Sequence, residues 1–192
     1  MKKSIIIALT ALASLFIHAG ASGTADKGEF ALVRISAANM RSKPGHSQEL
    51  ASQVVLGTPV KIIVQEGDWC KVQSPEGYTG WIIDNSLQKI SESEFSRWKK
   101  AERLVMTAPY QIRLYTDSLT DCLRNTVTDL VNGCIVEGEA IPAGNRVKVS
   151  LPDGRCGWGD AASFTPIVEW ADQEFDAEKI LTLAYSMEGQ TY

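Results

Sequence analysis

The chain has 192 residues, of which 22% are charged, and a formal net charge of −4. An acidic chain without a basic tract makes nucleic acid a poor candidate partner. Only two histidines occur and the four cysteines form no C-x-x-C pair, so we expect no bound metal or cofactor. The length allows one medium domain or two small ones.

Residues 1–21 have the pattern of a secretory signal peptide. Lys2 and Lys3 precede an apolar run over residues 5–17, and Ala19-Gly20-Ala21 follows it. A membrane anchor is the alternative, but the run is shorter than the roughly 20 residues that span a bilayer. We expect cleavage after Ala21, which removes the two lysines and changes the charge from −4 to −6. The protein is then exported, periplasmic or extracellular, without membrane association, and residues 22–29 form a linker.

Residues 30–90 read as a first small β domain. Strands are expected at residues 30–35, 54–56 and 60–64, with a long loop from residue 39. The segment from Trp69 to Trp81 follows as a hairpin, because Pro75-Glu76-Gly77 favours a tight turn. Five or six short strands with frequent turns are typical of a small barrel.

Residues 91–106 are predicted to be a helical linker. Ser91 and Glu94 form a capping box, which satisfies free amide donors at the start of a helix. Phe95, Trp98 and Val105 recur at helical spacing and give one apolar face. We expect Trp98 to pack between the two domains.

Residues 107–166 read as a second small β domain, because the segment from Lys71 to Trp81 recurs from Lys148 to Trp158. Two copies at this spacing favour two tandem domains over a solenoid. Seven positions are identical or similar: Lys71/Lys148, Val72/Val149, Pro75/Pro152, Glu76/Asp153, Gly77/Gly154, Gly80/Gly157 and Trp81/Trp158. We align residues 112–114 with residues 39–41, and residues 131–136 with residues 55–60.

The four cysteines lie at positions that the repeat does not relate. Cys70, Cys122, Cys134 and Cys156 allow three full disulfide pairings, and their spacing selects none. Cys70 alternates with Val72 along a strand, so we expect it to be a buried free thiol.

The last 26 residues are predicted to contain a helix. Asp176 can cap it, Gly189 can end it, and Ile180, Leu183, Ala184 and Met187 form an apolar stripe. A helix this short is marginal alone. It is therefore either a clamp on the second domain or the first element of a further domain.

These patterns in combination resemble bacterial SH3 domains. The loop Asn39-x-Arg41-x-x-Pro44 and the turn Gly67-Asp68-Trp69 carry the resemblance in the first domain, with Gly77-x-x-Gly80-Trp81. The second domain resembles another bacterial SH3 domain. The expected fold is thus mainly β, with two SH3-like barrels joined by a helix and a helix at the C-terminal end.

The terminal Gly189-Gln190-Thr191-Tyr192 is similar to the start of the NlpC/P60 cysteine peptidase domain. Together the segments resemble cell-wall γ-D-glutamyl-L-diamino-acid endopeptidases of the dipeptidyl-peptidase VI type. The resemblance implies that residues 167–192 begin a peptidase domain whose remainder is missing. That catalytic domain would be one partner. The other would be wall peptides with a free L-Ala amine.

The resemblance also implies which residues bind substrate. In the family an acidic residue and a tyrosine of the first SH3-like domain read the free amine, and Glu49 and Tyr78 match them here. Tyr192 of the Gly-x-x-Tyr motif is the third expected substrate-binding residue. Arg155 stands where the second domain would have the tyrosine.

No catalytic residue is assigned. A cysteine peptidase needs a thiolate with a histidine in hydrogen-bond reach, but no histidine follows His46 and Leu123-Arg124 follows Cys122 in place of Ser-Gly. The chain alone is not expected to hydrolyse peptides. Two functions remain: the targeting and specificity region of a cell-wall endopeptidase, or a stand-alone module that binds wall peptides or a protein without catalysis.

Overall fold

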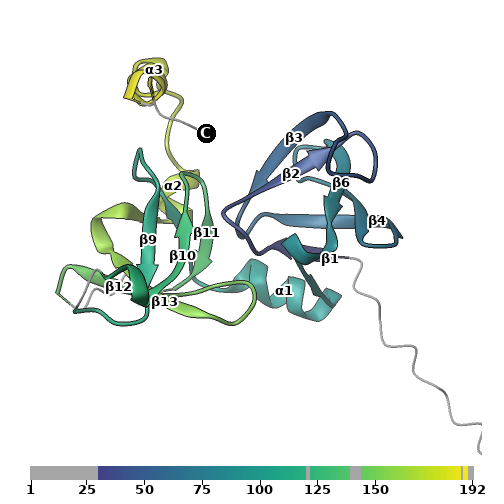
Figure 1. The fold of residues 1–192 in the computed structure, drawn as a ribbon. Coiled ribbons are helices and arrows are strands. Elements are labelled where there is room, and N and C mark those ends of the chain that lie inside the picture. Colours follow the sequence, from purple (N-terminus) through teal and green to yellow (C-terminus); the bar gives the residue numbers. More distant parts are fainter. Residues whose placement is uncertain (1–29, 120–121, 139–143, 187, 190–192) are drawn as a thin grey trace, which may run out of the picture.

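The computed structural model describes residues 30–119, 122–138, 144–186 and 188–189. The fold is mainly β, with two seven-stranded antiparallel sheets side by side and a helix packed below their junction (Figure 1). The strands of the first sheet are β1 Phe30–Val33, β2 Ala37–Arg41, β3 Leu50–Val55, β4 Pro59–Glu66, β5 Trp69–Gln73, β6 Thr79–Ile83 and β7 Leu87–Ile90. Those of the second are β8 Arg103–Met106, β9 Ile112–Tyr115, β10 Thr126–Leu130, β11 Ile135–Glu137, β12 Arg146–Ser150, β13 Cys156–Asp160 and β14 Phe164–Pro166.

The two sheets have the same topology. The strand order is β3-β2-β6-β5-β4-β1-β7 in the first and β10-β9-β13-β12-β11-β8-β14 in the second, so each strand has a counterpart seven strands later. Each order is linear, with β3 and β7, or β10 and β14, at its ends. The sheets are therefore open, and the expected closed barrels are not confirmed.

The repeated segments form the hairpins β5–β6 and β12–β13, as predicted. Their registers are equivalent, because Lys71 pairs with Trp81 and Lys148 pairs with Trp158. Gly80 and Gly157 are retained because a Cβ at either would lie 2.8 Å from the Cβ of Met40 or Leu114. Met40 therefore corresponds to Leu114, and our alignment of residues 39–41 with residues 112–114 was wrong by one residue.

Several predicted boundaries are wrong. Residues 37–41 were assigned in part to a loop but form β2, which lies between β3 and β6. The β3 strand begins at Leu50 and not at residue 54. Ala, Asn, Met and Arg have little intrinsic β preference, so pairing on both sides of β2 determines its conformation.

The interdomain helix α1 spans Glu92–Lys100 and is shorter than predicted. Its capping box is confirmed: the Ser91 amide donates to Glu94 at 2.8 Å, and the Glu94 amide donates to Ser91 Oγ at 3.3 Å. The helix ends at Lys100, because the following residues 103–106 pair with both β11 and β14 as strand β8. Val105 thus belongs to the second sheet and not to the helix.

Trp98 of α1 packs between the two sheets, as predicted. It is 1% exposed and lies in a cluster with Leu32 and Ile90 of the first sheet. Ile135 of the second sheet packs against the same cluster. The helix therefore supplies an apolar connection between the sheets.

A second connection comes from the residue that follows β3. Leu56 is fully buried in the core of the second sheet, although it belongs to the first repeat. Its carbonyl accepts a hydrogen bond from the Ile135 amide at 2.8 Å, and Ser36 Oγ donates to the Asp129 carbonyl at 3.0 Å. The two repeats thus share part of one core.

Two helices follow the second sheet. α2 Ile167–Ala171 packs beside β8 and β14, and α3 Ala177–Ser186 projects away from both sheets (Figure 1). Asp176 caps α3 as predicted, accepting from the amides of Glu178 and Lys179 at 3.0 and 3.1 Å. Across the part of the chain that the structure describes, no helix combines the length and apolar character needed to cross a bilayer.

Candidate functional site

Glu49 and Tyr78 lie in two loops at the same end of the first sheet. Arg41, the last residue of β2, pairs with Leu50 on one side and with Trp81 on the other. Glu49 immediately precedes Leu50, and Tyr78 immediately precedes β6. Relative to Arg41, Glu49 lies one residue further along its strand direction and Tyr78 three residues further, and β2 separates the two strands. Their backbones are therefore roughly 12 Å apart at the usual strand spacing and rise.

Both side chains point to solvent. Tyr78 is 64% exposed and Glu49 is exposed. A Glu and a Tyr side chain can together span this separation, and a carboxylate beside a phenol hydroxyl can bind an ammonium group through an ion pair and a hydrogen bond. The two predicted residues thus form one candidate site for a cation.

Hydrogen bonds hold the backbone at this site. Arg41 Nη1 donates to the Gln48 carbonyl at 2.7 Å, and the Ser42 amide donates to the Glu49 carbonyl at 2.9 Å. The Ser74 amide donates to the Tyr78 carbonyl at 2.9 Å. The loops are therefore fixed at the two positions where the Glu49 and Tyr78 side chains begin.

Sequence reasoning missed an aromatic contact next to this site. The His46 ring meets the Trp69 ring edge-on at a centroid distance of 5.1 Å. This contact brings the 42–49 loop against Trp69, the first residue of β5. Two residues in separate elements make the contact, so no local pattern in the sequence could reveal it.

The corresponding positions in the second sheet carry different residues, and these make structural contacts. By register, Asn125 and Arg155 occupy the places of Glu49 and Tyr78. Arg155 donates to the Asp153 carboxylate at 2.9 Å and to the Val127 carbonyl at 2.9 Å. Asp153, whose side chain is 6% exposed, also pairs with Arg34 of the first sheet at 3.3 Å. Here the hairpin holds the sheets together and offers no pair equivalent to Glu49 and Tyr78.

Cys122 and His46 are not brought together as a catalytic pair. His46 packs on Trp69 of the first sheet, whereas exposed Cys122 immediately precedes the 3-10 turn Leu123–Asn125 of the second repeat. Within the described residues, no three His, Cys, Asp or Glu side chains are grouped so that they could hold a metal ion.

The other thiols differ in burial. All four cysteines are free, with Cys70 and Cys134 buried and Cys122 and Cys156 exposed. Burial raises the pKa of both Cys70 and Cys134 to about 11, so these thiols stay protonated at neutral pH. The prediction that Cys70 is a buried free thiol is confirmed.

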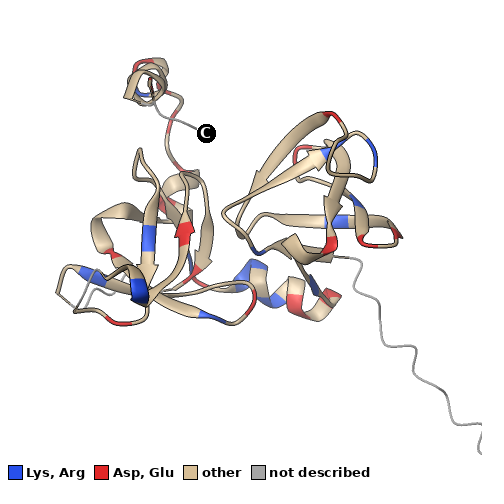
Figure 2. Ribbon diagram, in the orientation of Figure 1, with Lys and Arg blue, Asp and Glu red and all other residues tan. Residues whose placement is uncertain are grey.

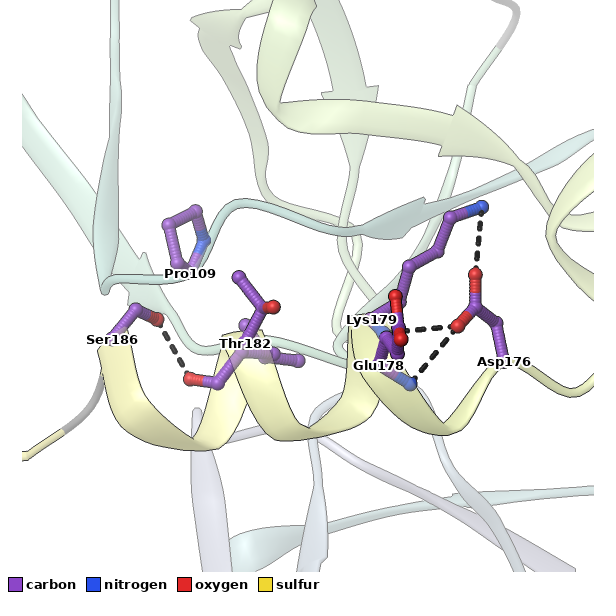
Figure 3. Close-up of a pocket in the computed structure, with 7 residues that line it drawn as sticks. Pro109, Asp176, Glu178, Lys179, Thr182 and Ser186 are labelled. Carbon is purple, nitrogen blue, oxygen red and sulfur yellow. Dashed lines mark hydrogen bonds and ion pairs between the residues drawn. The ribbon is translucent and has the colours of Figure 1, made fainter.

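The C-terminal segment exposes an apolar surface. Every side chain of α3 is exposed or half-buried, and Leu183 is the half-buried apolar residue. Thr182 and Ser186 lie on the side of α3 nearest to Pro109, across an open cavity of about 510 Å³ (Figure 3). Large exposed apolar residues of the segment are Val168, Trp170, Phe175, Ile180, Leu181 and Tyr185.

Four of the sequence-based predictions concern segments outside the described residues. These are the signal peptide over residues 1–21, the linker over residues 22–29, Met187 of the apolar stripe, and Tyr192 as a substrate-binding residue.

Comparisons with known proteins agree with the β architecture. Residues 36–88 match the family described as the bacterial SH3 domain. A Bacillus subtilis (strain 168) protein, YrvJ, named as an N-acetylmuramoyl-L-alanine amidase, is 27% identical over 108 residues. The aligned part is 56% of this chain and 21% of YrvJ, so the chain spans about a fifth of that relative.

One solved structure of an NlpC/P60 family protein has a similar fold. The crystal structure of a Bacillus cereus ATCC 10987 NlpC/P60 family protein matches with a TM-score of 0.58 at 19% identity, covering 71% of this chain and 55% of that one. An NlpC/P60 endopeptidase from Photobacterium damselae subsp. piscicida matches with a TM-score of 0.49 at 18% identity, covering 72% and 33%. The chain spans about half of the first of these structures.

Proposed function

We propose that this chain is the targeting and specificity region of an exported cell-wall endopeptidase that cleaves γ-D-Glu-diamino-acid bonds. The second sheet is a second SH3-like module in this proposal, and residues 1–21 are the leader that directs export. Glu49 and Tyr78 bind the free L-Ala amine of a wall peptide. The chain itself supplies no catalytic cysteine or histidine.

The observation that carries the proposal is the placement of Glu49 and Tyr78 at one end of the first sheet. The bacterial SH3 match covers both residues, and the similar proteins include a cell-wall amidase and NlpC/P60 proteins. Replacement of the pair by Asn125 and Arg155 in the second sheet supports a division of roles, in which the first sheet binds ligand and the second provides support.

Glu49→Gln is expected to weaken binding of an L-Ala-γ-D-Glu peptide by about fivefold to thirtyfold, because the ammonium loses a charged hydrogen bond worth about 1–2 kcal/mol. Isothermal titration calorimetry measures the change. Glu76→Gln is the matched control, since Glu76 is an exposed carboxylate in the neighbouring hairpin turn. An equal loss in both variants would indicate a general charge effect and contradict a specific site.

In this proposal α3 is the first element of the peptidase module, and its exposed stripe packs on that module. An exposed helix of ten residues is marginal in water. We therefore expect the amides of residues 180–186 in the 192-residue chain to exchange at nearly coil-like rates, while those of β5 and β12 stay protected. Hydrogen exchange with mass spectrometry resolves these segments.

The half-buried Leu183 and Ser186 beside Pro109 favour an alternative, a stand-alone non-catalytic module in which α3 closes onto the second sheet. Such a module would bind wall peptides or a protein partner without chemistry. Strong protection of residues 180–186 would support this alternative and contradict the role of α3 as a docking element.

A further inference from the structure

A pocket lies where α1, β8 and α2 meet, and Arg103, one of its lining residues, has an unpaired buried donor. Its volume is about 440 Å³, within the range of small-molecule sites. One wall is apolar and the other carries the charges of the α1 end. The lining residues used below are Lys99, Lys100, Arg103, Pro166, Ile167 and Val168.

The charge of the lining is predominantly positive. Lys99, Lys100 and Arg103 contribute three cations, against the single carboxylate of Glu102. Figure 2 shows this blue end of α1 beside the second sheet, while the red end of the helix lies toward the first. An anion therefore finds a favourable field in the pocket.

Arg103 provides the strongest evidence that the pocket binds a ligand. Its Nη2 donates to the Lys99 carbonyl at 3.1 Å, but its Nε is buried and has no acceptor. Burial lowers the pKa of this guanidinium, which means that its environment disfavours the charge. A buried donor without a partner costs about 1–3 kcal/mol.

A second unpaired donor belongs to Trp98, the aromatic residue under Arg103. The Arg103 guanidinium stacks over the Trp98 ring at 5.8 Å from the centroid, and the buried Trp98 Nε1 also has no acceptor. Glu137 is the cross-strand partner of Arg103, and its charge raises the pKa of the guanidinium. Arg97 Nη1 donates to both oxygens of Glu137 at 3.0 Å, so Arg97 already occupies this acceptor.

We propose that this pocket binds the carboxylate of a small amphiphilic ligand, such as a short peptide with an aliphatic side chain. The carboxylate accepts from Arg103 Nε, with Lys100 adding charge, whereas the Lys99 ammonium lies over the Phe95 ring at 4.5 Å. The aliphatic group contacts Pro166, Ile167 and Val168. This pocket binds an anion, whereas the proposed site at Glu49 and Tyr78 binds a cation. The two sites can therefore be tested separately.

The test uses the 15N-labelled 192-residue chain, with N-acetyl-L-leucine as probe and N-acetyl-L-leucine amide as its uncharged counterpart. We expect N-acetyl-L-leucine to shift the Arg103 Nε–H and Trp98 indole N–H signals in a saturable way. N-acetyl-L-leucine amide should not shift them. Glu49→Gln should leave this shift unchanged, which separates the site from the proposed amine site.

Lys100→Ala is expected to weaken carboxylate binding about threefold to fivefold, because an exposed charge contributes up to about 1 kcal/mol. Lys148→Ala is the control, since it removes an equal charge from an exposed strand position in the second sheet. Arg103→Lys keeps the charge but not the planar donor, and should abolish saturable binding. If Arg103→Lys does not fold, Lys100→Ala still tests the site.

Three outcomes would overturn the proposal. The first is the absence of any shift at about 20 mM probe, where a site with a 1 mM dissociation constant would be almost full. The second is an equal shift with the amide, and the third is an equal loss in Lys100→Ala and Lys148→Ala.

Discussion

Gly57→Ala is expected to destabilise the whole described fold by about 3 kcal/mol or more. Gly57 has φ of +81°, where a side chain costs roughly 1–2 kcal/mol. A Cβ there would also lie 1.9 Å from the Ile135 carbonyl oxygen of the second sheet, and relieving such overpacking typically costs 1–3 kcal/mol more. The contact is between backbones, so the sheets have to separate.

Urea denaturation followed by fluorescence measures this loss. Gly77→Ala is the control, because Gly77 has φ of +92° but nothing within 4 Å of the added Cβ. The difference between the two variants isolates the contact between sheets. Equal losses would contradict a tight junction at Gly57.

Trp98→Ala is expected to cost about 3–5 kcal/mol, the range for truncating a large buried aromatic side chain. Trp98 fills the space between Leu32, Ile90 and Ile135, so its loss opens a cavity shared by both sheets. We expect a lower midpoint and a broader thermal transition, because the sheets then unfold less cooperatively.

Trp170→Ala provides the comparison for Trp98, since Trp170 is 48% exposed and lies in none of the buried clusters. Its effect should stay within about 0.5 kcal/mol. A loss below 1 kcal/mol for Trp98→Ala in differential scanning calorimetry would show that α1 does not join the sheets.

The sequence predicts best the elements whose information is local. The hairpins at Lys71 and Lys148 follow from a turn triplet and a repeat, and the Ser91–Glu94 capping box follows from a three-residue spacing. Each of these needs only residues within one element, so the physics of the turn or cap decides the structure.

Strands without their own preference were harder to predict. Residues 37–41 and 103–106 become strands because partners on both sides hydrogen-bond to them. Such partners lie far away in the chain, so no local pattern records them. Whether a sheet closes into a barrel also depends on strands far apart in the chain. The sequence therefore led us to expect closed barrels, whereas the structure has open sheets.

The sequence predicted that Trp98 packs between the two domains, but it did not reveal the other contacts at the junction between the sheets. Leu56 reads as the last residue of a strand in the first repeat, yet its side chain completes the core of the second. Arg103 reads as part of a helix, yet it lies in β8 with an unpaired buried donor. Both facts depend on how two units pack. By contrast, the family resemblance selected Glu49 and Tyr78 residue by residue, and the structure places both at one end of the first sheet.

The most direct test of the central claim compares one wall peptide in two forms. The chain is titrated by calorimetry with an L-Ala-γ-D-Glu peptide carrying a free amine, and with the same peptide acetylated at that amine. Our account predicts binding of the free peptide and a loss of about fivefold to thirtyfold on acetylation, because Glu49 and Tyr78 then face a neutral amide. Equal affinity for the two peptides, or binding of neither, would contradict it.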